Sequence, residues 1–124
     1  MQTKRVVVTG LGALTPIGSN VSAYWDGLVS GKSGGAPITY FDASKFKTQF
    51  ACELKGYDPN DHFDRKEVRK MDKFTQYAMV ASDEAILDAG LNHDTLDKTR
   101  VGVIWGAGIG GLETFQNEVL DFAA

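Results

Sequence analysis

The chain has few of the residues that most often mark a chemical site. Its 124 residues include one cysteine, two histidines and three prolines. A single cysteine, Cys52, excludes an intramolecular disulfide or a thiolate metal cluster, and it agrees with a reducing compartment. His62 and His93 lack the spacing of zinc ligands, and turn-forming residues surround both of them. We therefore expect no metal site and interpret both histidines as solvated loop residues.

Long apolar runs and an excess of basic charge are also missing. No run reaches the roughly 18 apolar residues of a membrane span, and the N-terminal run is too short for a signal peptide. A net charge of −3 and a pI near 5.3 give no overall basic field for nucleic acid. An apolar content of 43% is enough for one modest core. We expect a soluble cytoplasmic protein with no membrane or nucleic-acid partner, and no domain boundary within residues 1–124.

Three segments are strand-like. Residues 5–10 form a continuous β-branched run, typical of a strand buried on both faces of a parallel sheet, and residues 100–105 repeat this pattern. Residues 50–54 form a shorter strand-like segment within an ordered excursion from Gly31 to about Phe63. Cys52 lies in that segment and has no obvious activating base, so we interpret it as a small apolar filler.

Three helices separate these segments and give an α/β order. Apolar spacing predicts a helix after Ser19 or Asn20 that ends at Gly31. A longer one follows Asp72, ends near Ala89 and is stopped by Gly90. A third begins after the glycine cluster at 106–111 and runs to the terminus. Gly10 and Gly12 do not complete a dinucleotide fingerprint, because Thr15 replaces its third glycine, so tight packing is the better explanation for them.

The glycine cluster offers a choice between two enzyme classes. Gly106, Gly108 and Gly111 spell G-x-G-x-x-G between a predicted strand and a predicted helix, as in Rossmann-type dinucleotide-binding modules. That alternative has a weakness. The ribose-binding acid belongs on a second strand about twenty residues later, and the given sequence ends within the predicted helix before such a strand could form.

A basic segment precedes the long helix. Residues 64–73 hold five of the chain's thirteen basic residues and three acids, so this segment is locally positive in an acidic chain. A charged run of this kind usually forms a solvated helical entry. Arg65 can alternatively turn inward as a structural ion-pair partner.

With its flanks, the sequence closely resembles the N-terminal part of the β-ketoacyl-acyl carrier protein synthases, the elongating condensing enzymes of fatty acid biosynthesis, and among them the synthase II type. The resemblance rests on residues 5–12, 15–18, 41–42, 65–72 and 108–111, which occur in family order with family-like spacing. It implies a thiolase-type fold of α-β-α-β-α layers that pairs as a homodimer. This chain would form the beginning of the first half.

The resemblance also implies a function, which is decarboxylative Claisen condensation of an acyl-enzyme with malonyl-acyl carrier protein, without a cofactor. The family's catalytic cysteine and two histidines lie further downstream, so the chain alone should be inactive. Residues matching Lys66, Arg69 and Lys70 dock the acidic acyl carrier protein, and the residue matching Ile109, flanked by Gly108 and Gly110, lines the acyl pocket. The residue-level alternative is that Ile109 is an ordinary core residue. A non-catalytic carrier-binding module is a further alternative.

Overall fold

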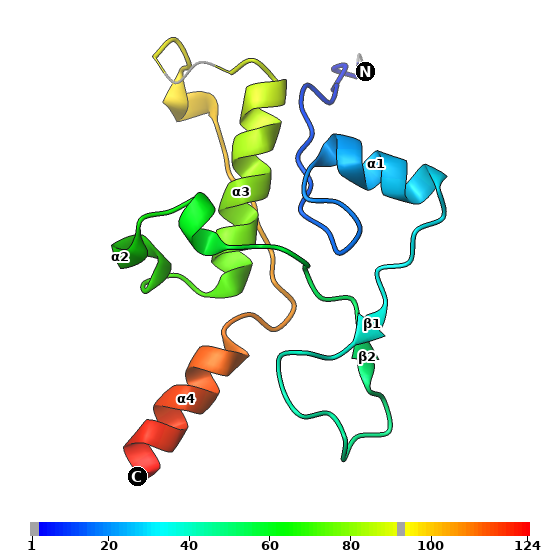
Figure 1. Cartoon of the computed structure of the whole chain (residues 1–124). Coiled ribbons are helices and arrows are strands. Elements are labelled where there is room, and N and C mark those ends of the chain that lie inside the picture. The colour runs from blue at the N-terminus through cyan, green and yellow to red at the C-terminus, as the bar shows by residue number, and fades with distance from the viewer. Residues whose placement is uncertain (1–2, 92–93) are drawn as a thin grey trace.

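The computed structural model describes residues 3–91 and 94–124, and the regular secondary structure in these ranges is mainly helical (Figure 1). No helix in this described part combines the length and apolar character needed to cross a bilayer. In chain order the elements are α1 (Val21–Val29), β1 (Ala36–Pro37), β2 (Phe50–Ala51), the 3-10 helix η1 (Pro59–Asp61), α2 (Arg65–Val68), α3 (Lys73–Asp88), the 3-10 helix η2 (Lys98–Arg100) and α4 (Leu112–Ala123).

Helix α3 is the element around which the others are arranged (Figure 1). Asp72 precedes it in an extended conformation, and Gly90 follows it with φ of 62°, the left-handed conformation that commonly ends helices. Gln76 and Ala81 are buried on it. The predicted helix from Asp72 to about Ala89 is confirmed.

Helix α1 also forms where the sequence predicts it. The side chain of Asn20 accepts a hydrogen bond from the Ala23 amide at 2.8 Å, which satisfies one of the free donors of the first turn. Gly31 follows the helix with φ of 68° and ends it. Of the two predicted capping residues, the structure therefore selects Asn20.

The glycine-containing loop before α1 lies directly against α3. A Cβ atom at Gly10 would lie 2.2 Å from the Ala85 carbonyl oxygen, and one at Gly12 would lie 1.8 Å from the Ala81 carbonyl oxygen. Only glycine permits so close an approach of two backbones. This confirms that tight packing, and not phosphate binding, explains the two glycines.

Two carboxylates of α3 hold the same loop by its backbone. Asp88 accepts a hydrogen bond from the Leu11 amide at 2.9 Å. Glu84 accepts one from the Ala13 amide at 2.8 Å and, through its other oxygen, one from the Val21 amide at 2.9 Å. Glu84 thus joins the loop, α1 and α3.

The excursion between α1 and α2 is ordered around a small hairpin. Strands β1 and β2 pair antiparallel with Ala36 opposite Ala51 and Pro37 opposite Phe50. The predicted strand at 50–54 is therefore confirmed only for its first two residues. Tyr57 then ties the excursion to α3, because its hydroxyl lies 3.2 Å from Oε1 of the buried Gln76.

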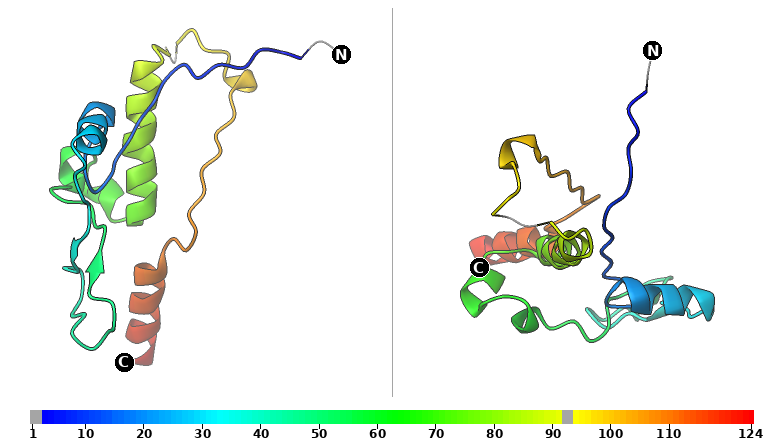
Figure 2. Two further views of the ribbon diagram at one scale, coloured as in Figure 1. Left: turned by 90° about the vertical axis from the view of Figure 1, so that its right-hand side faces the viewer. Right: turned by 90° about the horizontal axis from the view of Figure 1, so that it is seen from above.

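The two longer strand predictions are wrong for this structure. Residues 5–10 and 101–105 run as extended traces without a neighbouring strand (Figure 2). Val6 is 90% exposed and Ile104 is 99% exposed. A strand must find its hydrogen-bond partners on another segment, and the described part of the chain brings none beside these two runs.

Helix α4 forms as predicted but projects away from the rest of the molecule (Figure 1). Its apolar residues remain exposed, Phe115 and Phe122 among them. The described contacts that anchor it are concentrated at its first turn, beside the N-terminus of α3.

Candidate functional site

The basic segment is an exposed turn that leads into α3. Lys66 lies in the four-residue helix α2, Arg69 caps that helix, and Lys70 is in the turn that follows. All three are exposed, and none forms an ion pair within the residues that the structure describes. Arg65 is likewise exposed, so its alternative role as an inward-turned ion-pair partner is not supported.

The glycine turn before α4 divides into a free part and a packed part. Cβ atoms at Gly106 and Gly108 would meet no atom within 4 Å, whereas one at Gly110 would lie 2.7 Å from the Phe74 ring. Gly111 is the N-cap of α4 and has φ of 78°, which glycine adopts readily. The turn is therefore fixed at its C-terminal end.

Ile109 lies between these two parts and is not a core residue. Its side chain is 78% exposed and lines an open hollow of about 310 Å³ together with residues of α3 and the hairpin loop. The hollow is lined by Tyr40, Asp72, Lys73, Phe74, Tyr77, Ile109, Gly110, Gly111, Leu112 and Glu113. Its volume lies at the lower end of the range for small-ligand pockets.

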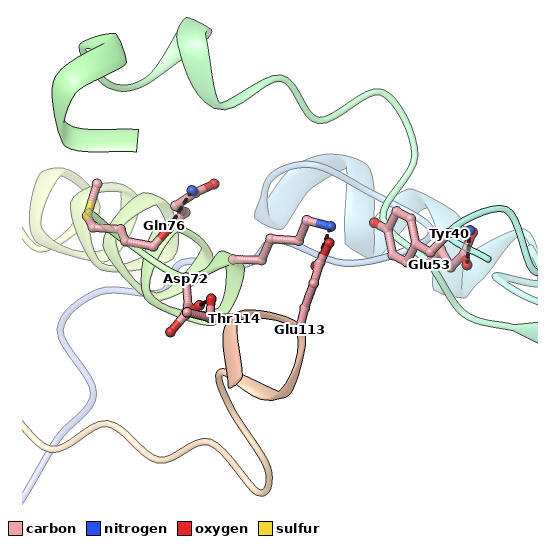
Figure 3. A network of polar contacts seen from close by, with 8 residues as sticks. Tyr40, Glu53, Asp72, Gln76, Glu113 and Thr114 are labelled. Atoms are coloured by element: carbon pink, nitrogen blue, oxygen red, sulfur yellow. Dashed lines mark hydrogen bonds and ion pairs between the residues drawn. The ribbon is translucent and has the colours of Figure 1, made fainter. Parts of the chain in front are cut away.

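Polar contacts join the starts of α3 and α4 at the edge of this hollow (Figure 3). The Thr114 hydroxyl donates a hydrogen bond to the Asp72 carboxylate. Lys73 Nζ lies 3.0 Å from Glu113 Oε2 and 4.4 Å from the centroid of the Tyr40 ring. No local pattern in the sequence predicts these contacts, because their partners lie 33 to 42 positions apart.

One carboxyl group and one phenol group near the hollow, those of Glu53 and Tyr77, have shifted pKa values. Hydrogen bonds from Thr39 hold the pKa of Glu53 below its ordinary value, with smaller help from Tyr40 and Lys73. Burial raises the pKa of Tyr77 well above its ordinary value. Tyr77 therefore stays neutral and lines the hollow as an uncharged, largely apolar group.

Within the described residues, the side chains that resemble nucleophiles or metal ligands do not assemble into a site. Cys52 is exposed, so its interpretation as an apolar filler is wrong. Together with Leu14 and Ile38 it lines an open hollow, and nothing in the described chain covers that hollow. His62 is exposed as expected and stacks on Tyr57, with ring centroids 5.6 Å apart. His93 lies outside the described residues, within which no group of metal-binding side chains occurs.

The chain is similar in sequence to one family of enzymes and to individual proteins within it. The family described as "Beta-ketoacyl synthase, N-terminal domain" matches residues 3–123. Relatives named 3-oxoacyl-(acyl-carrier-protein) synthase 2 include one from Synechocystis sp., 47% identical over 95% of this chain, and one from Staphylococcus aureus, 48% identical over 93%. The chain spans 28% of the length of each.

Solved structures give the same result for the fold. A β-ketoacyl synthase from Burkholderia phymatum matches 94% of this chain and 30% of its own, with a TM-score of 0.71 and 28% identity. The ishigamide ketosynthase/chain length factor matches 73% of this chain and 22% of its own, with a TM-score of 0.66 and 39% identity. A type II polyketide ketosynthase in complex with its acyl-carrier protein matches 77% of this chain and 25% of its own, with a TM-score of 0.56 and 27% identity.

These matches decide between the two interpretations of the glycine cluster. The Rossmann alternative is not favoured, because the family match extends through the cluster and no strand in the described residues leads directly into it. The fold is thiolase-type, and the chain corresponds to the N-terminal portion of its structural neighbours. The chain belongs to the β-ketoacyl synthase family, whose N-terminal domain it matches almost from end to end.

Proposed function

We propose that the protein carrying this chain is an elongating 3-oxoacyl-acyl carrier protein synthase of fatty acid biosynthesis that works in the cytoplasm. The family match over residues 3–123 carries the proposal, and the two relatives of that name at 47% and 48% identity support it. Within that protein, this chain would contribute a docking surface and part of an acyl pocket, and it would require no cofactor.

The proposed reaction needs groups that the chain does not place together. In it, the acyl group is held as a thioester on an enzyme cysteine, and malonyl-acyl carrier protein loses carbon dioxide. The resulting carbanion attacks the thioester carbonyl, and the enzyme thiolate leaves. An activated thiolate and aligned oxyanion donors are required. Cys52 and His62 are both exposed, and neither contacts the hollow at Ile109. The chain alone should therefore be inactive.

The basic segment supports a docking role for an acidic acyl carrier protein. Lys66, Arg69 and Lys70 are exposed and free of ion pairs within the described residues, so no internal acid competes for them. Complementary charge of this kind guides encounter and orients a partner. The segment leads directly into α3, whose first residues line the hollow. An acyl carrier protein bound there would deliver the phosphopantetheine arm that holds its acyl group close to the pocket.

The open hollow at Ile109 supports the acyl-pocket role. Ile109 offers an apolar side chain, and Gly108 before it leaves space for an approaching chain, whereas Gly110 after it packs against the Phe74 ring. The hollow and the exposed face of α4 need a covering surface, and a second copy of the full-length protein would supply one in the proposed homodimer.

The overall reaction is tested with the full-length protein. Acyl-acyl carrier protein and malonyl-acyl carrier protein should yield 3-oxoacyl-acyl carrier protein and carbon dioxide in equal amounts. The 124-residue chain alone should yield neither. Absence of product from the full-length protein would refute the proposed reaction.

The docking role is tested by charge reversal. Lys66→Glu, Arg69→Glu and Lys70→Glu together should raise KM for carrier-bound substrates about tenfold and spare a small thioester mimic. The matched control carries Lys45→Glu, Lys47→Glu and Lys98→Glu, which makes the same change in net charge at other exposed positions. Equal losses on both substrates, or equal effects in the control, would contradict docking.

The pocket role is tested at Ile109. Replacing it by phenylalanine adds bulk at the hollow and should shorten the longest acyl chain that the full-length enzyme accepts. The measurement is kcat/KM across a series of acyl lengths. An unchanged profile would remove Ile109 from the pocket wall.

A further inference from the structure

Three consecutive residues, which begin at the N-cap of α3, contact the first turn of α4 and the glycine turn before it; Figure 3 shows the contact of Asp72 with Thr114. The contacts are Asp72 with the Thr114 hydroxyl, Lys73 with Glu113 at 3.0 Å, and the Phe74 ring with the backbone of Gly110. Within the described residues, no other segment makes a side-chain hydrogen bond or ion pair to α4. The first turn of α4 is therefore held by one short piece of chain.

Asp72 lies at the N-terminal ends of two helices. It is the N-cap residue of α3, yet its side chain makes no capping hydrogen bond there. Across the junction, the N-cap of α4 is Gly111, which has no side chain, and Asp72 Oδ2 lies 3.1 Å from the position that a Cβ of Gly111 would occupy. An acid from a distant helix thus lies beside the first turn of α4, where it accepts a hydrogen bond from the Thr114 side chain. The positive end of a helix favours a carboxylate at this point.

The three contacts differ in how well they can fix the turn. The Lys73–Glu113 pair is solvent-exposed, with 48% and 71% of the two side chains accessible, and such pairs contribute little. Phe74 blocks the turn from one side but forms no directional bond with Gly110. The hydrogen bond from Thr114 to the Asp72 carboxylate is also exposed to solvent, but it is directional and charge-assisted, and Asp72 is itself half-buried, so it is the contact best suited to fix the turn.

The position of Ile109 depends on this junction. The residues before it are free, since Gly106 and Gly108 would meet nothing within 4 Å even with a Cβ. Gly110 and Gly111, which follow it, are the first points at which the turn contacts α3. We propose that Asp72 is a positioning residue for the acyl pocket, and that it fixes Ile109 indirectly by holding Thr114 and the first turn of α4. The inference rests on the proposed role of Ile109 as a pocket wall.

The test measures chain-length selectivity in the full-length enzyme. Asp72→Ala and Thr114→Val each remove the hydrogen bond, and a less firmly held wall should discriminate less against acyl chains just too long to fit. We expect the ratio of kcat/KM for the longest accepted chain to that for the next longer chain to fall about fivefold, the effect of one hydrogen bond. Thr114→Ser keeps the hydroxyl and should retain the normal ratio.

The controls separate this inference from the function on which it rests. Asp83→Ala removes an exposed acid of α3 that has no hydrogen-bond or ion-pair partner in the described residues, and it should leave the ratio unchanged. A shifted profile in Ile109→Phe with unchanged ratios in Asp72→Ala and Thr114→Val overturns the positioning role alone. An unchanged profile in Ile109→Phe overturns the pocket itself. Lower thermal stability and lower kcat at a constant ratio would make Asp72 merely structural. If Asp72→Ala does not fold, Thr114→Val decides.

Discussion

Residues 10–14 and residues 101–108 are both glycine-containing apolar segments, yet they differ in almost every contact. Gly10 and Gly12 lie so close to α3 that neither has room for a methyl group, whereas Gly102, Gly106 and Gly108 have no neighbour within reach of a Cβ. Backbone amides of the first segment also donate hydrogen bonds to side-chain carboxylates of α3, and the second segment has no such anchor among the described contacts. Similar composition therefore gives one packed loop and one exposed connection.

The difference follows from what each segment has beside it. Helix α3 closes its own backbone hydrogen bonds within four residues, so it forms without neighbours and then offers a surface. Residues 10–14 lie along that surface. Residues 101–105 are suited to a strand, and a strand is stabilised only by another strand. In the described chain, the only paired strands are the two-residue β1 and β2.

The largest effect is expected from a substitution that disrupts the packed segment, residues 10–14. Gly12→Ala would place a methyl group 1.8 Å from the Ala81 carbonyl oxygen, so the loop must move off α3. We expect a loss of about 3 kcal/mol in the free energy of unfolding, measured by urea denaturation. Gly106→Ala is the matched control, and it should change that free energy by no more than about 0.5 kcal/mol.

The opposite result would reverse the conclusion drawn from the two segments. If Gly106→Ala destabilised the 124-residue chain as much as Gly12→Ala, residues 101–108 would have neighbours in solution that the structure lacks. If neither variant changed the unfolding transition, the close approach of residues 10–14 to α3 would contribute nothing to stability.

A smaller effect is expected from the carboxylate that holds the packed loop. Glu84→Ala leaves the Ala13 and Val21 amides without their acceptor, in a partly buried position. We expect this change to lower the free energy of unfolding by about 2 kcal/mol in the same measurement. Glu84→Gln keeps one oxygen acceptor and should fall in between.

The adjacent Asp83 provides the control for this experiment. It is exposed and has no side-chain partner within the described residues, so Asp83→Ala should be nearly neutral. Equal losses in Glu84→Ala and Asp83→Ala would mean that a general change in the charge of α3, and not the anchoring of the loop, is responsible.

The sequence predicted the elements that depend on local chemistry. Asn20 with Gly31, and Asp72 with Gly90, bound two helices correctly, because caps and left-handed glycines act within a turn of the helix. The strand at 5–10 was predicted from an equally clear pattern, but its pairing depends on another segment. Pattern alone reports that a run suits a sheet, and it does not report whether a partner is present.

The residues of the candidate site also differ in whether a local pattern in the sequence predicts them. Lys66, Arg69 and Lys70 were predicted from local charge, and the structure leaves them exposed. The docking role itself stays a prediction. The contact of Asp72 with Thr114 spans 42 positions, and no local signal identifies it, because Asp72 already has a sufficient explanation as an N-cap. The side chain of a residue at an N-cap position can thus bind a distant helix while it makes no capping hydrogen bond of its own.

The smallest expected effect concerns the hairpin, which is intermediate between the packed and the exposed segments. The Glu53 carboxylate accepts hydrogen bonds from the Thr39 hydroxyl at 2.7 Å and from the Thr39 and Tyr40 amides at 3.1 and 3.4 Å. These bonds favour the charged form and hold the pKa of Glu53 below its ordinary value. Acid should therefore weaken this anchor.

The sign follows from linkage. Because the pKa of Glu53 is lower in the folded chain than in the unfolded one, its contribution is complete above the unfolded pKa and is lost as the pH falls through the folded pKa. The Thr39 amide resonance should shift in that acid range, and Glu53→Gln should abolish the shift. Glu118→Gln, at an exposed position of α4 without a side-chain partner in the described residues, should leave it in place. A titrating Thr39 amide in Glu53→Gln would show that the hairpin, like residues 101–108, is not held by the contact that the structure gives it.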